Sequence, residues 1–507
     1  MGSTNNTTPT WKQFNRPWYL KFLYSIGGYF KNVGLMLWRV IKAIPFKIWG
    51  FILGIGLCFR GLWFRFRHGD WRTKVSYLIM GFGCFSRSPK QIVKGLLLFA
   101  IEALFVLYMV LLGGPNLARF GTLGTVEFVS VNQPYDNSLT ILLYSVLAII
   151  LIIAFAYMYV LNTKIAYNTQ KMVEAGKPLT GFKQQLNYAL NDGYNVTILI
   201  LPILGVFLIT ILPLMCNILV AFTSFDGKHL PPQNLFGWVG MNNFKSVFTG
   251  SDSTLIWRIL GWTLIWAVFA TFSNFFFGMF LAMIINKKSI KLKVFWRTCF
   301  IIVIAIPDFI TLLMMSNFFS SSDIPSTTGP FNLMLQQWFG IKDANFDFFG
   351  TRSMKAMNAR IMIIVVNLWR GMPYTMLATY GILMNIPDEL YESSKIDGAG
   401  PVRRFVSITF PYIMFVMAPQ LITTFTGNLN NFNVIFFLTG GGPTPVGSTV
   451  GSTDLLITYL YKLTINGDAK RYGQGAVLGI FMFLISSFFA LIVFNSSKSN
   501  TQEDTFQ

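Results

Sequence analysis

Long apolar runs dominate the hydrophobic pattern of this chain, and polar segments of very different lengths separate them. A helix crosses a bilayer core with about 20 consecutive apolar residues, and about eight runs reach that length. A shorter apolar run at 48–59, flanked by Lys47 and Arg60, favours a helix at the membrane surface over a ninth span. The pattern predicts an all-α integral membrane protein with spans at residues 94–113, 139–162, 195–223, 258–286, 298–320, 359–385, 411–432 and 474–496.

The segment between the sixth and seventh runs is polar and carries clear signals for the start and end of a helix. A proline and an aspartate at 387–388 suit a first turn, and Gly398 suits a left-handed residue just past the end. These signals predict a short helix over 388–397. The Gly-Pro pair at 400–401 then breaks the chain, and 402–408 is expected to form a second short helix. A helix–turn–helix held at a membrane surface is suited to docking another protein.

Composition and charge agree with a membrane protein and indicate its orientation. The chain is 53% hydrophobic and 12% charged, whereas a soluble chain carries about 25% charged residues. Its net charge of +20 is concentrated in residues 1–92 and in the loops that follow the second and fourth spans, which all lie on one side in an eight-span count. By the positive-inside rule, both termini and the 386–411 loop are cytoplasmic. This distribution argues against nucleic acid as the partner.

The sequence offers little for catalysis or metal binding. Its two histidines, His68 and His229, are far apart, and no Gly-x4-Gly-Lys-Ser/Thr phosphate loop is present. We therefore expect no enzyme activity, no metal and no cofactor of its own; if ATP drives the protein, ATP and Mg²⁺ are used on other subunits. The four cysteines lie in apolar settings without metal-ligand spacing, as expected of packing residues: Cys58, Cys84, Cys216 and Cys299.

Two other classes of function remain open at this point. A secondary transporter driven by protons or sodium commonly needs ionisable groups within its spans, and Asp308 and Glu102 are the clear acidic candidates. A membrane-embedded transferase would need a compact carboxylate cluster, whereas acids such as Asp343 and Asp347 are scattered.

The polar segment at 386–411 resembles the conserved cytoplasmic loop of ATP-binding-cassette importer permeases. That loop reads Glu-Ala-Ala, three residues, Gly, nine residues, then Ile-x-Leu-Pro; here serines replace both alanines and Phe410 replaces the leucine. The resemblance implies that the ATPase subunits dock on this loop and that the acidic Glu392 pairs with an arginine of the ATPase. The residues implied in this coupling are Glu392, Ser393, Ser394, Asp397, Gly398, Ile408 and Pro411.

From about residue 195 to near the C-terminus the chain resembles carbohydrate permeases of this family, which have a type I ABC importer permease fold. The resemblance is carried by Asn242-Asn243-Phe244, Trp369-Arg-Gly-Met-Pro-Tyr374 and Thr439-Gly-Gly-Gly-Pro443. The stretches Gly427–Phe432 and Thr453–Tyr459 particularly resemble the maltose/maltodextrin branch. In Gram-negative members of that branch a large folded insertion lies between the third and fourth spans, and here residues 224–257 are too few for such a domain.

Polar residues in two spans mark a candidate sugar path. Thr424, Asn428 and Asn431 are spaced i, i+4, i+7, which places them on one face of a helix, and Asn367, Gly371 and Tyr374 repeat that spacing. In the maltose branch the matching positions contact sugar, so the resemblance implies a substrate site at these six residues. The alternative is that the polar side chains form hydrogen bonds between helices.

Two neighbours of these residues, Arg370 and Pro373, also bear on the predicted path. Pro373 is expected to open the helix locally, because it removes a backbone hydrogen bond. Arg370 departs from the maltose branch, and its side chain either faces the path or extends toward an interface.

Taken together, these features predict the organisation and partners of the protein. We expect a basic, aromatic-rich extension at 1–92 that contacts membrane lipid, two accessory spans at 93–194, a permease core at 195–497 and a tail at 498–507. The resemblance implies a bacterial cell-membrane importer of sugars, most specifically malto-oligosaccharides. Its implied partners are a second permease subunit, two ATPase subunits and an extracellular sugar-binding protein.

Overall fold

The structure is a computed structural model, and it is helical almost throughout. It describes residues 53–130, 132–250, 253–287, 289–322, 328–341, 345–351, 353–466 and 470–496, together with Lys42, Pro45, Lys47, Trp49 and Gly50. Among these residues the β-structure is limited to an isolated bridge between Thr223 and Trp238. Part of the predicted surface helix at 48–59 falls outside the described residues, and 53–68 are helical.

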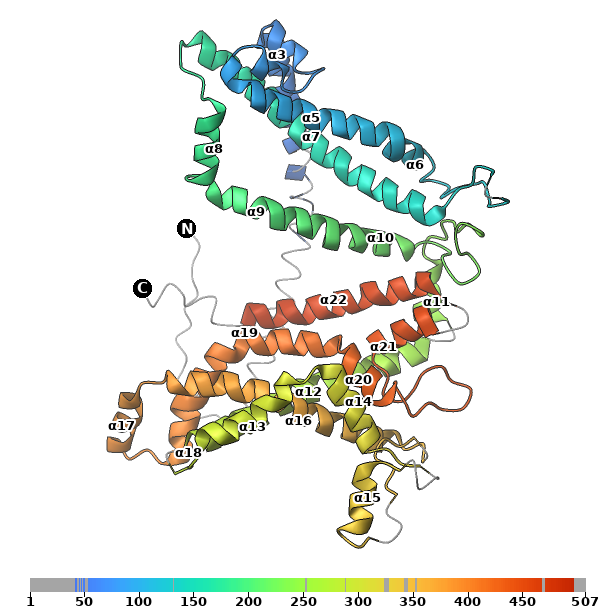
Figure 1. Cartoon of the computed structure of the whole chain (residues 1–507), viewed down its shortest axis with the longest axis vertical. Coiled ribbons are helices and arrows are strands. Elements are labelled where there is room, and N and C mark those ends of the chain that lie inside the picture. The colour runs from blue at the N-terminus through green and yellow to red at the C-terminus, as the bar shows by residue number, and fades with distance from the viewer. Residues whose placement is uncertain are drawn as a thin grey trace. The chain divides into compact units, whose positions relative to one another are not determined.

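The expected number of spans is confirmed. Seven described helices are long and apolar enough to cross a membrane, and an eighth is reached if one bent pair counts as a single span. Two compact units divide the chain: residues 1–121 with 140–213, and residues 122–139 with 214–507. Each unit is described separately below (Figure 1).

The first unit contains two long helices and an N-terminal connecting segment, which we define as residues 70–91. Helix α5, Ile92–Tyr108, continues through a π-helical turn, Met109–Gly113, into α6, Gly114–Ala118. Helix α7 spans Ser138–Glu174, and α8, Phe182–Leu190, leads to α9, Tyr194–Gly205. A second π-helical turn, Val206–Ile211, joins α9 to α10, Leu212–Val220, so the third span runs into the second unit. The N-terminal connecting segment consists of α3, Trp71–Val75, α4, Phe82–Phe85, and a 3-10 turn, Pro89–Gln91.

Buried polar contacts hold the N-terminal connecting segment to α5 and α7. Arg87 pairs with Asp70 and also donates to the backbone oxygen of Ala166 at 2.9 Å. Asn162 of α7 accepts from the backbone N–H of Gly81 at 2.9 Å. Glu102, which stood alone in an apolar run, accepts from the backbone N–H of Met80 at 2.7 Å. The carboxylate in the first span therefore has a structural role in this unit.

The second unit is organised around α12, Ser253–Asn286, and α16, Ala356–Met384. Glycines let these helices approach closely: a Cβ on Gly278 would lie 1.9 Å from the Thr375 hydroxyl, and one on Gly371 would lie 2.3 Å from the Asn274 amide. The Thr375 hydroxyl also donates to the backbone oxygen of Asn274 at 2.6 Å. Small residues and interhelical hydrogen bonds thus stabilise this pair, as is typical where lipid replaces water.

The other helices of the second unit surround this pair, and its two ends differ. One end carries a protruding elbow built from α17, Asp388–Ile396, and α18, Pro401–Arg404 (Figure 1). The opposite end carries short helices and loops: α11, Asn242–Thr249; α15, Pro330–Gln337; α20, Phe432–Thr439; and α21, Leu456–Tyr461. The remaining spans are α13, Lys293–Ala305, with α14, Asp308–Phe318; α19, Phe410–Leu429; and α22, Tyr472–Ser496.

Two predicted spans have a different form in the structure. The fifth is not one helix, because α13 and α14 meet at an angle of 96°. The break occurs at Ile306, whose extended backbone precedes Pro307, and residues before proline disfavour the helical region. The seventh begins at Pro401 and ends at Leu429, instead of covering 411–432.

Candidate functional site

The predicted helix between the sixth and seventh spans is confirmed. Helix α17 begins at Asp388 and ends at Ile396, one residue before the expected end. Gly398 has the left-handed backbone that the sequence predicted, with φ of 72°, and a Cβ there would meet nothing within 4 Å. The backbone N–H groups of Gly398 and Ala399 bond to carbonyls of the last turn, so glycine is needed for its backbone conformation and not for lack of space.

The second elbow helix was predicted wrongly as a separate element. Helix α18 passes through a π-helical turn, Phe405–Thr409, directly into α19, so Pro401–Leu429 is one continuous helix. Proline at its first turn lacks an N–H that would in any case be unpaired, and Pro411 lies further along the same helix. The Tyr391 hydroxyl lies 2.9 Å from the Thr409 hydroxyl and thereby ties α17 to this helix.

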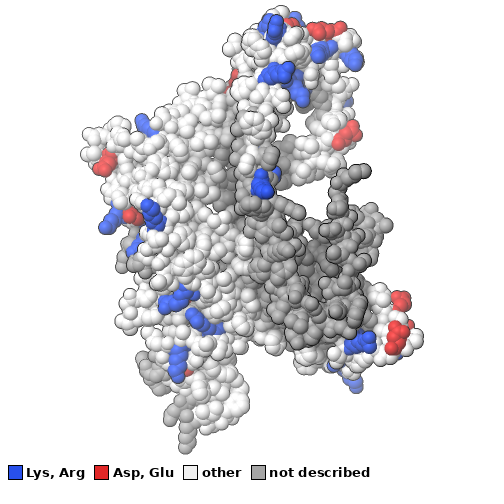
Figure 2. Space-filling model, turned by 180° about the vertical axis from the view of Figure 1, so that it is seen from behind, with Lys and Arg blue, Asp and Glu red and all other residues white. Residues whose placement is uncertain are grey.

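The elbow exposes a mixed acidic, basic and apolar surface. Glu392 is exposed on α17, and the neighbouring apolar side chains of Ile396 and Val402 are 87% and 76% exposed. Figure 2 shows acidic and basic side chains grouped on this protrusion. Ser394 and Ser393 instead bond to carbonyl oxygens of their own helix, at 2.8 and 3.3 Å. A charged surface with exposed apolar side chains is suited to binding a protein partner.

The three predicted substrate residues on α16 have different surroundings. Asn367 is buried, and its side-chain oxygen accepts from Arg370 at 3.4 Å. Gly371 lies at the close approach to α12, and Tyr374 is half-exposed. The helix continues through Pro373, so the expected local opening is absent from the described helix. In this conformation, Tyr374 is the residue of the three that is most accessible.

The second predicted set does not share one helix face. Helix α19 ends at Leu429, so Asn431 lies beyond it and caps α20 by accepting from the backbone N–H of Val434 at 3.3 Å. Asn428 is buried and donates to the Thr271 hydroxyl at 3.0 Å, while Asn431 donates to Asn428 at 3.2 Å. Thr424 is partly buried on α19. The i+7 spacing predicted a common face only on the assumption that the helix continued to Asn431.

Arg370 has a partner that the sequence did not identify. Its guanidinium forms an ion pair with Asp308, the first residue of α14, just after the break in the fifth span. The Asp308 side chain is 41% exposed and that of Arg370 is 17% exposed. The pair joins the broken span to α16, and it accounts for both charges that the sequence left unassigned in these segments.

At the end opposite the elbow, the Thr439–Pro443 and Thr453–Tyr459 motifs meet at Asp454. Its buried carboxylate accepts from Lys462 at 2.7 Å, from the Thr458 hydroxyl at 2.9 Å and from the backbone N–H of Gly451 at 2.7 Å. Gly441 has φ of 88°, and a Cβ there would lie 1.9 Å from the Asp454 carboxylate. Side chains at this glycine are therefore excluded both by the backbone and by the carboxylate.

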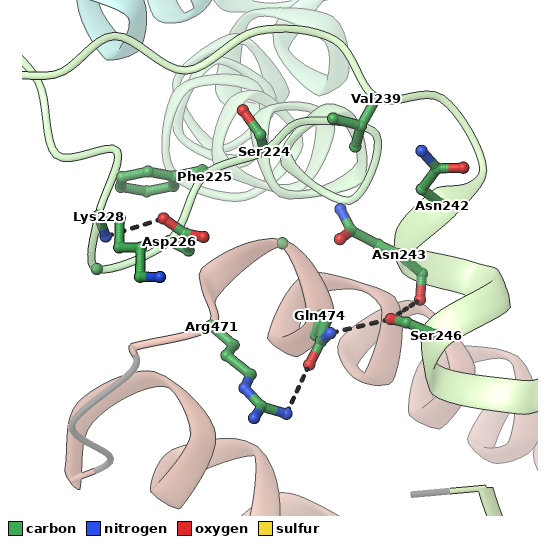
Figure 3. A pocket seen from close by; sticks show the side chains of 12 residues that line it. Ser224, Phe225, Asp226, Lys228, Val239, Asn242, Asn243, Ser246, Arg471 and Gln474 are labelled. Atoms are coloured by element: carbon green, nitrogen blue, oxygen red, sulfur yellow. Dashed lines mark hydrogen bonds between the residues drawn. The ribbon is translucent and has the colours of Figure 1, made fainter. Parts of the chain in front are cut away.

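A polar pocket of about 570 Å³ lies at the same end, between α11, the loop before it and the start of α22 (Figure 3). Gln474 donates to the Ser246 hydroxyl at 2.9 Å, and Arg471 donates to Gln474 at 3.4 Å. Asn243 donates to the backbone oxygens of Ala221 and Thr223, at 3.0 and 2.7 Å. These contacts fix α11 between the third span and α22, and they give the Asn-Asn-Phe motif a structural role. Sequence reasoning missed this pocket, because its walls come from segments more than 200 residues apart.

Comparison with known proteins decides the family. Residues 274–499 match the family described as "Binding-protein-dependent transport system inner membrane component". The galactooligosaccharides transport system permease protein GanP of Bacillus subtilis is 34% identical over 440 residues, which cover 84% of this chain and 97% of GanP. The chain belongs to the sugar permeases of this family. It is a multi-pass membrane permease subunit of an ATP-binding-cassette importer.

Further relatives of this permease carry maltodextrin names. The maltodextrin transport system permease protein MalC of Streptococcus pneumoniae is 33% identical over 422 residues, covering 82% of this permease and 93% of MalC. The maltose/maltodextrin transport system permease protein MalF of Salmonella typhimurium is 35% identical over 264 residues, which cover 51% of this permease and 49% of MalF. The resemblance to the carbohydrate permeases, including the maltose/maltodextrin branch, is therefore confirmed.

The family match also places the elbow in context. The matched residues include α13 to α22 and the last part of α12, so both the α17–α18 elbow and the six predicted substrate positions lie inside it. Within the described residues, no group of three or more His, Cys, Asp and Glu side chains could hold a metal ion. Glu102, Asp308 and Asp347 make structural contacts with neighbouring groups. Glu392 and Asp397 lie on the elbow.

Proposed function

We propose that this permease imports malto-oligosaccharides and forms the translocation path together with a second permease subunit. The proposal is supported by the names of MalC and MalF and by the polar residues of α16 and α19. The substrate contacts proposed are Asn367, Gly371, Tyr374, Thr424, Asn428 and Asn431. Asn367 and Asn428 are buried in the described conformation, so their contact with sugar requires a second conformation in which the helices separate.

The observation that carries the proposal is the exposed α17–α18 elbow. It presents Glu392 beside the apolar side chains of Ile396 and Val402, and its backbone is fixed by the turn at Gly398 and the Tyr391–Thr409 contact. Two ATPase subunits would each need a rigid handle outside the membrane, and this elbow supplies the one on this chain. ATP and Mg²⁺ are used by those subunits, whereas this permease contributes no cofactor.

The proposed orientation places both termini and the elbow in the cytoplasm. It rests on the basic residues of 1–92 and of the second and fourth loops. The helix at 53–68 exposes Trp63, Phe64 and Phe66 among arginines, a composition suited to the headgroup layer of an anionic leaflet. The opposite end, with α11 and α21, then faces an extracellular sugar-binding protein.

Reconstitution tests the function. The permease is placed in proteoliposomes with its partner permease, the ATPases and the binding protein, and ATP hydrolysis is measured with maltotriose, longer maltodextrins and galacto-oligosaccharides. We expect stimulation by binding protein loaded with maltodextrins. Stimulation by galacto-oligosaccharides alone would show that these, and not maltodextrins, are the substrate. No stimulation by any saccharide would contradict the proposal of a sugar importer.

A labelling experiment tests the orientation independently. A cysteine introduced at Lys395 of the exposed α17 should react with a membrane-impermeant maleimide only after the cells are opened. Reaction in intact cells would place the elbow outside and would contradict docking of an ATPase there.

A further inference from the structure

A second pocket at the end opposite the elbow contains two arginines. It has a volume of about 240 Å³ and lies between the first turns of α12 and α16 and the loop before α21. Arg258 and Trp262 of α12 and Arg360 of α16 line it together with residues of that loop. Arg258 is exposed, and Arg360 is partly buried with its guanidinium 4.4 Å from the centre of the Trp262 ring.

The positive charge of this pocket is not balanced by its own acid. Asp454 contributes to the lining, but its carboxylate is fully buried and already paired with Lys462. Two guanidinium groups therefore share one small pocket and repel each other. Arginine side chains with this arrangement favour an anion, and a carboxylate can accept paired hydrogen bonds from a guanidinium.

A third polar group lies in the pocket wall without a partner. The Ser452 hydroxyl is buried and makes no hydrogen bond, although the Ser452 backbone oxygen accepts from Arg360 at 3.1 and 2.9 Å. A buried hydroxyl without a partner costs free energy unless a ligand or water bonds to it. Arg360 is thus oriented by the loop that also presents this hydroxyl.

We propose that this pocket receives an acidic side chain, aspartate or glutamate, from the docking surface of the extracellular binding protein. This inference rests on the proposed function, which places the pocket on the extracellular side. A volume of about 240 Å³ fits one side chain and is below the ~300–1,000 Å³ typical of sites for small-molecule ligands, so it does not favour an oligosaccharide. Ile259, Pro445 and Val450 add apolar side chains to its lining, which can contact the CH₂ groups of that acidic side chain.

The test varies the concentration of maltotriose-loaded binding protein over proteoliposomes that contain the complete complex, and ATP hydrolysis is measured. Arg258→Glu should raise the half-maximal binding-protein concentration about tenfold, because a rim ion pair is replaced by repulsion, and leave the maximal rate unchanged. Raising the salt concentration should weaken docking of the wild type more than that of Arg258→Glu. Replacing the matching carboxylate of the binding protein by lysine should restore docking to Arg258→Glu.

The control is Lys245→Glu, which makes the same change of charge at an exposed position on α11 outside this pocket. A half-maximal concentration for Arg258→Glu equal to that of this control would overturn the inference. So would an effect that follows the fraction of anionic lipid instead of the binding protein, since the anion would then be a lipid phosphate. If the wild-type complex itself shows no stimulation by binding protein, the proposed function fails, and the two failures are therefore distinguishable.

Discussion

Arg370 on α16 pairs with Asp308 at the first turn of α14, across the break in the fifth span. The acid also lies at a helix N-terminus, where the helix dipole favours negative charge. The pair therefore fixes the second half of a broken span against the helix that carries three of the proposed substrate residues.

This pairing leads to a prediction about the stability of the permease. Arg370→Leu leaves Asp308 without its cation and should lower the free energy of unfolding by about 1–3 kcal/mol, less than for a fully buried pair because Asp308 is 41% exposed. The double variant Asp308→Asn/Arg370→Leu should recover most of the loss. Thermal unfolding in detergent, monitored by size-exclusion chromatography, compares the stability of the single and the double variant with that of the wild type.

Uptake by the same double variant separates two mechanisms. An ATP-driven importer should keep substantial uptake without Asp308, whereas a proton- or sodium-driven transporter that relies on this acid should lose it. Abolished uptake in a double variant of normal stability would revive the ion-driven alternative.

The elbow provides the next prediction. Glu392→Ala should reduce sugar uptake and co-purification of the ATPases, at a docking cost of about 2–5 kcal/mol if the acid pairs with a buried arginine of the ATPase. Delivery of sugar by the binding protein should be unchanged. Glu389→Ala, an exposed acid on the same helix, is the matched control, and equal effects of the two substitutions would argue against a specific role for Glu392.

Glycines at the opposite end can be compared directly. Gly441 and Gly447 have similar backbones, with φ of 88° and 81°, but a Cβ on Gly441 meets the Asp454 carboxylate and one on Gly447 meets nothing within 4 Å. Gly447→Ala should cost about 1 kcal/mol for its backbone alone. Gly441→Ala should cost several times more, visible as a lower unfolding temperature. Equal losses of unfolding temperature would show that the contacts of Asp454 rearrange without a cost in stability.

The proposed sugar site gives a prediction that separates binding from packing. Tyr374→Ala should lower uptake with little change in unfolding temperature, because the side chain is half-exposed. Asn428→Ala should also lower stability by about 0.6–1.7 kcal/mol, since it removes an interhelical hydrogen bond to Thr271. Thr271→Val should reproduce that loss of stability, and its uptake shows how much of the Asn428 effect is packing.

The features that sequence predicted well are local. Apolar length identified the spans, and Gly398 marked the end of α17 because a left-handed residue there follows from the nearby turn alone. The break at Ile306 also had a local signal in Pro307, but the apolar run continued across it and suggested one helix.

The features that sequence missed depend on contacts between distant segments. Asp454 and Gly441 are close only after the loop between α20 and α21 has folded back, and Arg370 meets Asp308 from another helix. The end of α19 at Leu429 has a different cause, because Asn431 caps α20 through Val434, three residues on, a local signal that a helical spacing rule does not include. The first two cases required the three-dimensional path of the chain.

The union of α18 with α19 has a mechanical consequence. At about 1.5 Å per residue, the 29 residues from Pro401 to Leu429 form a lever about 43 Å long. A tilt of about 5° shifts the far tip of such a lever by about 4 Å. A small displacement of the α17–α18 elbow can thus be passed along one continuous helix, through the π-helical turn at Phe405–Thr409 and past Pro419, to the end that carries Asn428.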